Sequence, residues 1–449
     1  MRKFFSWPRR LWLRIPFWIL MLVVLFFVGR FAVDSVIPWR PVPVAQVPFL
    51  EHAATKTLGN TQVTVSALGA EESYHVFGRP LALLGIQPIW VKVKNDERVP
   101  LWYLRAGTDN EWYSPYEAYY ANRLRAPRED NKKMEQLFYS LSFQNPVMPG
   151  ETKSGFIFTR LDEGTKPVDI DVIGLGVVRS FSFQVRVPGF FSDVRQDVYQ
   201  PDPSKVVVVE SEAELRAELE KYPAEVTNKE GDKTGDPLNI VCVGAPQDVF
   251  PAFSRRGWHP TEQTRGASVM KTIRSALFGR VYLYSPVSPL YVYGRSQDLS
   301  AQKARGDVNM RNHLRLWLTP LRYHDKQVWL GQISRDIGVR VIWGIPPTTH
   351  KIDPDTDEAR NGLTQDLAYS QALARFGFVK GVGAAPREQP RHNLTGDPFF
   401  TDGLRVVLFF ENRPTTLGRI EMVDWERPPG MPAGSLFGMG GANDQRPKD

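Results

Sequence analysis

Cysteine is almost absent from this sequence: Cys242 is the only one among 449 residues. One thiol excludes an intramolecular disulfide, a cysteine-rich zinc site and a Cys-x-x-Cys redox motif. Cys242 lies in the apolar run Leu238–Val243, where we expect a small buried side chain. The fold must therefore be stabilised by packing rather than by covalent cross-links.

Three common catalytic signatures are also missing. The sequence contains no Gly-x-x-x-x-Gly-Lys-Ser/Thr phosphate loop, no His-Glu-x-x-His zinc motif and no Gly-x-Ser-x-Gly nucleophile elbow. No internal repeat is evident, so a solenoid is not expected. Three large enzyme classes therefore lose their usual sequence evidence.

Most of the chain has no excess of charge of either sign. The net charge is +7, yet residues 1–40 hold seven basic side chains and one acidic one, which accounts for +6. The remainder, with 49 basic and 48 acidic residues, is nearly neutral. A nucleic-acid binder needs a basic face to displace counterions from phosphates. We therefore expect no nucleic-acid partner.

A long apolar run occupies residues 11–33, with Ile19–Val28 uninterrupted and Arg14 and Arg30 near its two ends. About 20 apolar residues cross the roughly 30 Å of a bilayer core as a helix. Tryptophans, which favour the membrane interface, lie around the two boundaries of the run, at Trp7, Trp12, Trp18 and Trp39. Residues 11–33 are therefore expected to contact membrane lipid, within an anchor at residues 1–36.

A cleaved signal peptide is the alternative, because it shares the basic start and the apolar core. The segment Val28–Val33 offers no well-placed pair of small residues for a signal peptidase, which favours an uncleaved signal-anchor. Five basic residues precede the core, against Arg30 and Arg40 after it, which places the N-terminus in the cytoplasm. The sequence thus predicts a single-pass protein of the inner (cytoplasmic) membrane with an extracytoplasmic, periplasmic remainder.

The rest of the chain is predicted to be α+β, with a proline-rich linker at residues 37–56. Residues 57–195 show period-two alternation, typical of a β-sandwich-like accessory domain, with a helix at Arg128–Leu141. The expected strands are Thr61–Ala67, Trp90–Lys94, Val168–Val172 and Phe181–Val187. Four tyrosines fit either a sugar or lipid platform or, more simply, aromatic packing of the core: Tyr113, Tyr116, Tyr119 and Tyr120.

Residues 196–236 are expected to be a linker with a short helix, begun by the capping box Ser211-x-x-Glu214 and ending near Tyr222. Residues 237–425 are expected to form a mixed α/β domain, and residues 426–449 a disordered tail. The expected strands of that domain are Leu238–Val243, Tyr291–Tyr293, His313–Leu318, Val328–Ile333, Gly338–Trp343 and Leu404–Phe410. Its expected helices are Pro246–Phe253, Ser268–Phe278 and Asp357–Phe376.

An acidic loop precedes the last of these helices. Asp353, Asp355 and Asp357 have the spacing of a calcium loop, but Glu358 and Thr364 replace the required glycine and glutamate, which excludes an EF-hand. The structural interpretation makes Asp353 the N-cap residue and places acids in the first turn of the helix. The competing interpretation adds His350, so that His350, Asp353 and Asp355 bind a divalent metal, or His350 acts as a base.

A second polar group lies on the predicted strand His313–Leu318. His313, Arg315 and Trp317 alternate with three leucines, so they share one face. A solvated face is the simple interpretation. Two roles are open for five basic residues of this region. They recognise a phosphate by charge-assisted hydrogen bonds, or they form surface ion pairs. The five are Arg295, Lys303, Arg311, Arg315 and Arg335.

Four segments in order resemble the LssY C-terminal-type domain of bacterial envelope proteins. They are Ser288–Asp298 (SPLYVYGRSQD), Asn312–Trp317 (NHLRLW), Asp336–Gly338 (DIG) and Thr349–Arg360 (THKIDPDTDEAR). The resemblance covers about residues 237–425 and carries no defined activity. Related domains are joined to membrane segments or to phosphatidic-acid phosphatase type 2 domains, which implies lipid or envelope metabolism. The single apolar run leaves no room here for that phosphatase.

Resemblance and chemistry together give two functional hypotheses. In the first, the domain binds an envelope lipid head group, a glycan or a partner protein, through Arg295, Gln297, Asp298, Arg315 and Asp336. In the second, it hydrolyses a phosphorylated or lipid substrate, with His350, Asp353 and His313 as catalytic residues and a divalent metal held by Asp355, Asp353 and His350.

Overall fold

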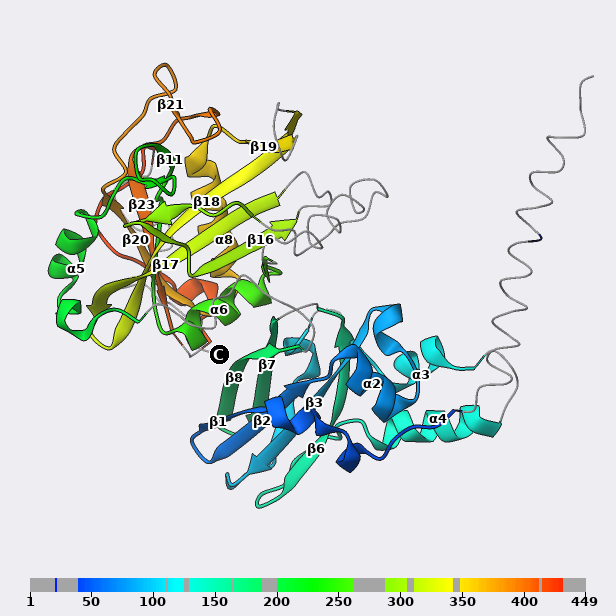
Figure 1. Cartoon of the computed structure of the whole chain (residues 1–449). Coiled ribbons are helices and arrows are strands. Elements are labelled where there is room, and N and C mark those ends of the chain that lie inside the picture. Colours follow the sequence, from blue (N-terminus) through cyan, green and yellow to red (C-terminus); the bar gives the residue numbers. More distant parts are fainter. Residues whose placement is uncertain are drawn as a thin grey trace, which may run out of the picture. The chain divides into compact units, whose positions relative to one another are not determined.

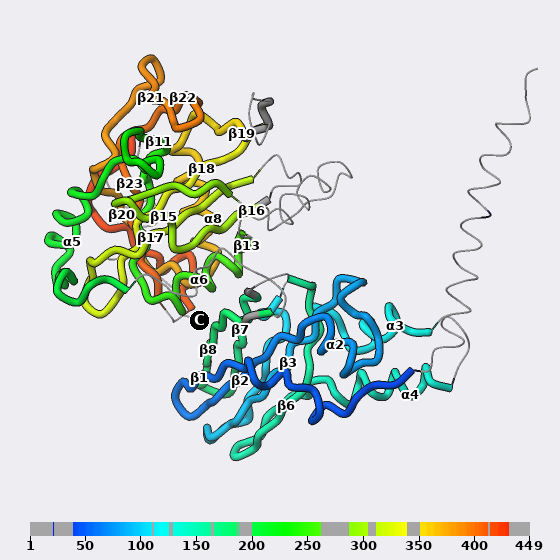
Figure 2. The backbone as a smooth tube through the Cα atoms, viewed as in Figure 1, coloured from blue at the N-terminus to red at the C-terminus, as the bar shows by residue number. Residues whose placement is uncertain are grey.

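The computed structural model shows a mixed α+β protein (Figures 1 and 2). It describes residues 21, 39–109, 112–124, 129–162, 165–187, 200–261, 287–304, 311–341, 348–411 and 414–430. The contacts divide the chain into two compact units. Unit 1 comprises residues 1–161 and 173–177, and unit 2 comprises residues 162–172 and 178–449.

Unit 1 is built on an antiparallel five-stranded sheet of order β1-β2-β3-β6-β5. Its strands are β1 (Ala54–Leu58), β2 (Thr61–Ala67), β3 (Ile86–Asn95), β6 (Thr152–Arg160) and β5 (Trp112–Tyr113). A further sheet has the order β4-β7-β8, with β4 (Trp102–Tyr103), β7 (Thr165–Gly174) and β8 (Val177–Arg186). The boundary between the two units falls within β7 and β8.

Helices cover one face of the five-stranded sheet. They are α2 (Ala70–Phe77), α3 (Pro115–Asn122) and α4 (Glu129–Ser140). Phe77, Ala118 and Phe138 from the helices pack with Phe156 and Phe158 of β6 in one apolar cluster. The helix expected at residues 128–141 is confirmed by α4, whereas α2 and α3 give this region more helix than its strand pattern predicted.

Unit 2 contains a large mixed sheet of order β13-β16-β17-β18-β12-β23-β20-β24, with β19 paired to β18 and β9 to β17. Its strands are β13 (His259–Pro260), β16 (Leu299–Ala304), β17 (Arg311–Tyr323), β18 (Lys326–Val341), β12 (Ile240–Val243), β23 (Leu404–Phe410), β20 (Leu373–Lys380), β24 (Glu421–Met422), β19 (Thr348–Ile352) and β9 (Val207–Val209). The neighbours of β12 are antiparallel β18 and parallel β23, which places this apolar strand at the centre of the sheet.

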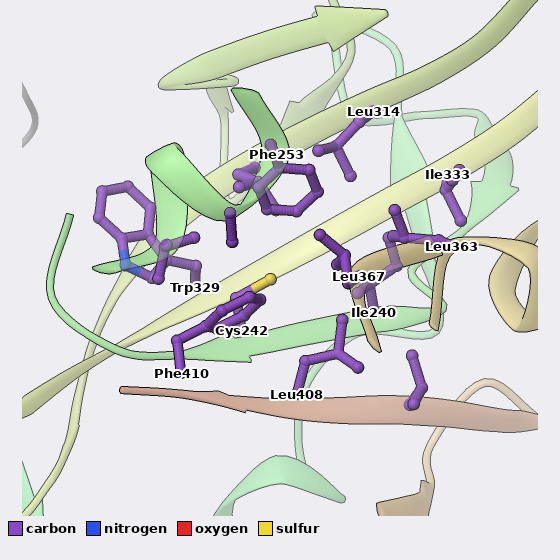
Figure 3. Close-up of a cluster of buried hydrophobic side chains, with 14 of the residues drawn as sticks. Ile240, Cys242, Phe253, Leu314, Trp329, Ile333, Leu363, Leu367, Leu408 and Phe410 are labelled. Carbon is purple, nitrogen blue, oxygen red and sulfur yellow. The ribbon is translucent and has the colours of Figure 1, made fainter. Parts of the chain in front are cut away.

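Both faces of this sheet are buried. One face packs against α6 (Pro246–Arg255) and α8 (Thr356–Ala368), and Figure 3 shows Phe253 and Leu363 from these helices gathered around Cys242. The other face packs against α5 (Glu212–Leu219), which contributes Leu215 and Leu219. A sheet that is covered on both faces explains the continuous apolar runs of its central strands.

Residues 207–237, expected to be mainly a linker, contribute to the unit 2 core. The capping box of α5 is present, as expected, since Ser211 accepts a hydrogen bond from the Glu214 amide. Val209 of β9 and Val226 lie in the same apolar cluster as α5. A small sheet of order β11-β10-β14-β15 follows, with β11 (Thr234–Pro237), β10 (Glu225–Thr227), β14 (Tyr291–Val292) and β15 (Arg295–Ser296). The strands β21 (Arg391–His392) and β22 (Pro398–Phe399) form a separate pair.

Three expected elements differ in extent from the observed ones. The helix expected at Asp357–Phe376 ends at Ala368, and strand β20 begins at Leu373. The strands expected at Val328–Ile333 and Gly338–Trp343 are one strand, β18, which reaches Val341. This long strand has a register shift opposite β19 between Asp336 and Gly338.

Several predictions concern residues outside the described ranges. These are the anchor at residues 11–33, apart from Met21, the helix at Ser268–Phe278 and most of the tail at residues 426–449. Within the described ranges, no helix combines the length and apolar character that crossing a membrane requires.

Candidate functional site

Strand β17 presents a leucine face and a charged face. Leu314, Leu316 and Leu318 belong to the apolar cluster beneath α6 and α8, as the alternation predicted. Arg311, His313 and Arg315 occupy alternate positions and point to the opposite face. That face is not solvated, because Arg311 is 2% exposed and both His313 and Arg315 are 7% exposed. The simple interpretation of a polar solvent-facing strand is therefore wrong.

Neighbouring strands place more polar side chains around these three. In the register, His313 lies opposite Gln302 of β16 and Ser334 of β18, and Arg315 lies opposite Ser300 and Gln332. Opposed residues in an antiparallel pair share a face of the sheet. All of these side chains are buried. We call the following set the polar patch: Ser300, Gln302, Arg311, His313, Arg315, Gln332, Ser334 and Asp336.

Hydrogen bonds connect the patch across the strands. Arg311 Nη1 donates to Gln302 Oε1 at 2.9 Å, and Arg315 Nη1 donates to Gln332 Oε1 at 2.9 Å. Arg315 Nη2 also donates to the carbonyl oxygen of Ser288 at 3.1 Å. Asp336 supplies the carboxylate of the patch: its Oδ2 lies 2.8 Å from His313 Nε2. The acceptors of these hydrogen bonds are two side-chain amides and one backbone carbonyl.

Burial controls the protonation of the patch. Desolvation lowers the pKa of His313, and the charges of Arg311 and Arg315 lower it further, against the opposing effect of Asp336. The imidazole is therefore neutral at neutral pH. Burial also lowers the pKa of Arg311 despite Asp336, although a guanidinium stays charged at neutral pH.

A second carboxyl group, Asp236 of β11, acts on the patch. Burial raises the pKa of Asp236, and Asp336 and Asp397 raise it further, while Arg315 and the hydrogen bond from Asn393 lower it. Asn393 Nδ2 donates to Asp236 Oδ1 at 3.1 Å. Asp236 thus lies within electrostatic reach of Arg315.

Three predicted binding residues have structural partners, and their role in binding stays a prediction. Asp298 Oδ2 accepts a hydrogen bond from the Leu318 amide at 2.7 Å, and Arg295 Nη2 donates to the Leu318 carbonyl at 2.7 Å. Arg295 and Asp298 also form an ion pair. Gln297 Oε1 accepts the amide of Leu290 at 3.0 Å. These residues fasten the β14-β15 hairpin and the start of β16 to neighbouring backbone.

Two of the five basic residues that were predicted to bind a phosphate also have structural partners. Lys303 Nζ lies 2.8 Å from Asp366 Oδ2 of α8, and Arg335 Nη1 lies 3.4 Å from Glu358 Oε1. Both are ion pairs, as one alternative predicted. Of the five basic residues proposed for a phosphate, the structure places Arg311 and Arg315 together in the polar patch.

The acidic loop begins helix α8. Asp355 is its N-cap residue and accepts the Glu358 amide at 3.0 Å, whereas Asp353 was expected to be the cap. Asp353 Oδ1 accepts the Asp355 amide at 3.1 Å. His350 is paired with Val339 in the β18-β19 ladder, and its side chain lies outside the described part of the structure.

No cluster of three or more potential metal-ligating side chains occurs within the described ranges. The proposed metal set of His350, Asp353 and Asp355 therefore stays a prediction. The two aspartates already satisfy backbone amides at the helix start, which is what the capping interpretation requires.

The start of α8 is fixed by a buried arginine that sequence reasoning did not select as functional. Arg360 is fully buried, and its two terminal nitrogens donate to both oxygens of Asp402 at 2.7 and 2.9 Å. Arg360 Nη1 also donates to the Leu404 carbonyl at 2.8 Å. The bidentate geometry of this pair fits a role in holding α8 to the chain that enters β23.

Sequence reasoning also missed Gln302, Gln332 and Asp236 as neighbours of the charged strand. Gln302 and Gln332 stand at alternate positions of apolar strands, a signal that was present in the sequence. Asp236 carries no such signal, because it reaches the patch through the fold of the β10-β11 hairpin.

Residues 216–404 match the protein family described as LssY C-terminus. The chain contains an LssY C-terminal-like domain. The match begins within α5 and ends at the first residue of β23, so the LssY C-terminal-like domain includes the whole polar patch. It starts earlier and ends earlier than the expected residues 237–425. No curated protein matches the chain.

Proposed function

We propose that the LssY C-terminal-like domain binds a polar, anionic envelope ligand at the polar patch. The observation that carries the proposal is the burial of Arg311 and Arg315 on one face of β17, one on either side of His313. An anionic group, such as a phosphate or a carboxylate, accepts charge-assisted hydrogen bonds from guanidinium groups.

The charges of the patch support an anion rather than a cation. Asp336 lies against His313 and also acts on Arg311, so one carboxylate serves more than one partner. Burial raises the pKa of Asp236, the carboxyl group that acts on Arg315. Each guanidinium group has one carboxyl group within electrostatic reach, Asp336 for Arg311 and Asp236 for Arg315. Both guanidinium groups offer hydrogen-bond donors and no acceptors, which suits an anion.

Calorimetric titration of the full chain with inorganic phosphate, glycerol phosphate and a neutral sugar tests whether the polar patch binds an anion. We expect phosphate compounds to bind and an Arg315→Gln variant to lose most of the binding. Arg375→Gln is the matched control, because Arg375 is a strand arginine of the same unit that pairs with Glu212. Equal binding by both variants, or tighter binding of the neutral sugar, argues against the proposal.

We also propose that residues 11–33 anchor the protein in the inner membrane, with the N-terminus in the cytoplasm and the chain after residue 36 outside it. The support is the uninterrupted apolar core and the excess of basic residues before it. A C-terminal alkaline phosphatase fusion is expected to be active, and a C-terminal fluorescent protein that folds only in the cytoplasm is expected to be dark. The opposite pair of results contradicts this orientation.

A hydrolase is the second candidate, favoured by the 2.8 Å approach of Asp336 Oδ2 to His313 Nε2. A carboxylate that orients a neutral imidazole is the arrangement of a general base. Burial lowers the pKa of His313, which keeps the imidazole neutral. This candidate uses His313 as the base, whereas the sequence hypothesis gave that role to His350.

The hydrolase is tested by screening the full chain on phosphomonoester, phosphodiester and lipid-ester substrates with added divalent metals. Turnover that disappears in His313→Asn and falls in Asp336→Asn, while both variants still melt cooperatively, is the expected result. A His350→Ala and Asp353→Ala double variant separates the two proposed bases. Turnover that survives in His313→Asn removes His313 from the mechanism.

A further inference from the structure

Helix α3 exposes two tyrosine side chains. The helix starts at the N-cap residue Ser114, with Pro115 in its first turn, and buries Ala118 and Asn122. Tyr116 and Tyr120 are one helical turn apart and point outward, with Tyr120 64% exposed. Figure 1 shows α3 beside α4, and the two helices are in contact.

The surface that these two tyrosines form continues onto neighbouring elements. Helix α4 buries Met134 and Phe138 but leaves Tyr139 exposed, with its ring centroid 5.7 Å from that of Tyr116. The short helix η3 (Leu81–Leu84) contacts α3 and exposes two leucines. We call the following set the aromatic face: Leu83, Leu84, Tyr116, Tyr120 and Tyr139. Leu83 is 83% exposed, which is unusual for leucine in a water-facing position.

The chain that follows the apolar run is fastened to α2, which contacts two of the helices that carry this face. Trp39 Nε1 donates to the Phe77 carbonyl at 2.8 Å, and the Val42 amide donates to the His75 carbonyl at 2.7 Å. Both acceptors are in α2, which contacts η3 and α4. Trp39 stands six residues after the apolar run ends at residue 33, and six residues span at most about 20 Å. A bilayer anchored by that run lies within this distance of α2.

We propose that the aromatic face of unit 1 lies in the head-group layer of the membrane. The inference rests on the proposed anchor at residues 11–33. Tyrosine combines an apolar ring with a polar hydroxyl, which suits the membrane–water interface. Leucines on such a face enter the boundary between head groups and acyl chains to a depth of about 5–10 Å. Arg123, whose guanidinium lies 3.4 Å from the centre of the Tyr120 ring, adds a cation at the level of the lipid phosphates.

Single-cysteine labelling tests this placement in the full chain. The native thiol of Cys242 is fully buried, so a cysteine introduced at the surface takes up the label. Leu83→Cys and Tyr120→Cys carry an environment-sensitive fluorophore on the aromatic face, and Thr57→Cys, exposed on β1, is the matched control in the same unit. The labelled proteins are reconstituted into vesicles of phosphatidylcholine and phosphatidylglycerol that contain a lipid with a doxyl quencher near its head group.

We expect several-fold greater quenching at positions 83 and 120 than at position 57, and weaker quenching when the doxyl group is near the end of the acyl chain. Vesicle flotation in the same samples reports on the anchor separately. Protein that floats with equal quenching at all three positions overturns the aromatic-face inference and leaves the anchor standing. Protein that does not float overturns both. The high exposure of Leu83 makes that substitution structurally mild, so it remains informative if Tyr120→Cys disturbs α3.

Discussion

Replacing Asp402 by alanine tests whether the acidic segment at the start of α8 is structural. Asp402 accepts two hydrogen bonds from Arg360, whose side chain is fully buried. Asp357 also belongs to this network, since its Oδ1 lies 3.2 Å from Arg360 Nη1 and its Oδ2 accepts the Asp402 amide at 2.6 Å. Asp402→Ala therefore leaves a buried guanidinium with one fewer charged partner.

The partners that Arg360 keeps determine how much free energy of unfolding Asp402→Ala loses. Breaking a buried ion pair by removing one member costs about 3–5 kcal/mol. Arg360 keeps the Leu404 carbonyl and the Asp357 carboxylate, so we expect the lower end, about 3 kcal/mol. In a domain of roughly 150–250 residues this lowers Tm by about 6–12 °C. Replacing both members by uncharged residues, in Arg360→Met with Asp402→Ala, removes the unpaired charge and is expected to recover most of the loss.

Urea unfolding of the full chain, followed by tryptophan fluorescence, measures both variants against the parent protein. Trp258, Trp317 and Trp329 are buried in unit 2 and report on its unfolding. A loss below about 1 kcal/mol in Asp402→Ala, the size of an exposed ion pair, refutes the reasoning. A double variant that is less stable than the single one refutes it as well, because the penalty then does not come from the unpaired guanidinium.

Four further predictions concern other parts of the chain. Burial lowers the pKa of His313 below its ordinary 6.5, so the unfolded state binds more protons just below that pH and stability falls as the pH drops through this range. Urea midpoints should show this loss in the parent protein and a smaller one in His313→Gln. A Cβ on Gly155 would lie 2.5 Å from the backbone nitrogen of Phe143, so Gly155→Ala should lower the free energy of unfolding by about 1–3 kcal/mol. Burial raises the pKa of the Cys242 thiol, so a thiol reagent should modify it only in urea; rapid modification of the native protein would contradict the core shown in Figure 3. Removing the cap in Asp355→Ala should cost about 1 kcal/mol in thermal melts and leave phosphate binding unchanged, whereas lost binding would assign this loop to the ligand site.

Strands with clear alternation and clear ends were predicted well. The bounds of β2 (Thr61–Ala67) and β23 (Leu404–Phe410) agree with the sequence prediction. The helix predicted through Phe376 failed because the turn after α8 contains no glycine or proline. Gln371 makes that turn with φ of 62°, a conformation usually taken by glycine. Nothing in the local residue types therefore marks the end of the helix.

The polar patch was predictable in part. Alternation along one strand placed His313 and Arg315 on a common face, and this is confirmed. Their burial depends on β16 and β18 pairing on either side, and on the β10-β11 hairpin bringing Asp236 near Arg315. Such contacts arise from register and topology, which the pattern of a single strand does not contain.

The partners of each charged side chain separate structural from functional candidates more clearly than residue type does. The carboxylates of Asp298, Asp353 and Asp355 accept hydrogen bonds from backbone amides. Each of them therefore stabilises the local conformation of the backbone. Arg311 and Arg315 instead donate hydrogen bonds to side-chain amide and backbone carbonyl oxygens in a buried environment, where a charge interacts more strongly than in water. The proposed anion site rests on these two buried guanidinium groups on one face of β17, and the proposal therefore places the ligand at the polar patch rather than at the acidic loop.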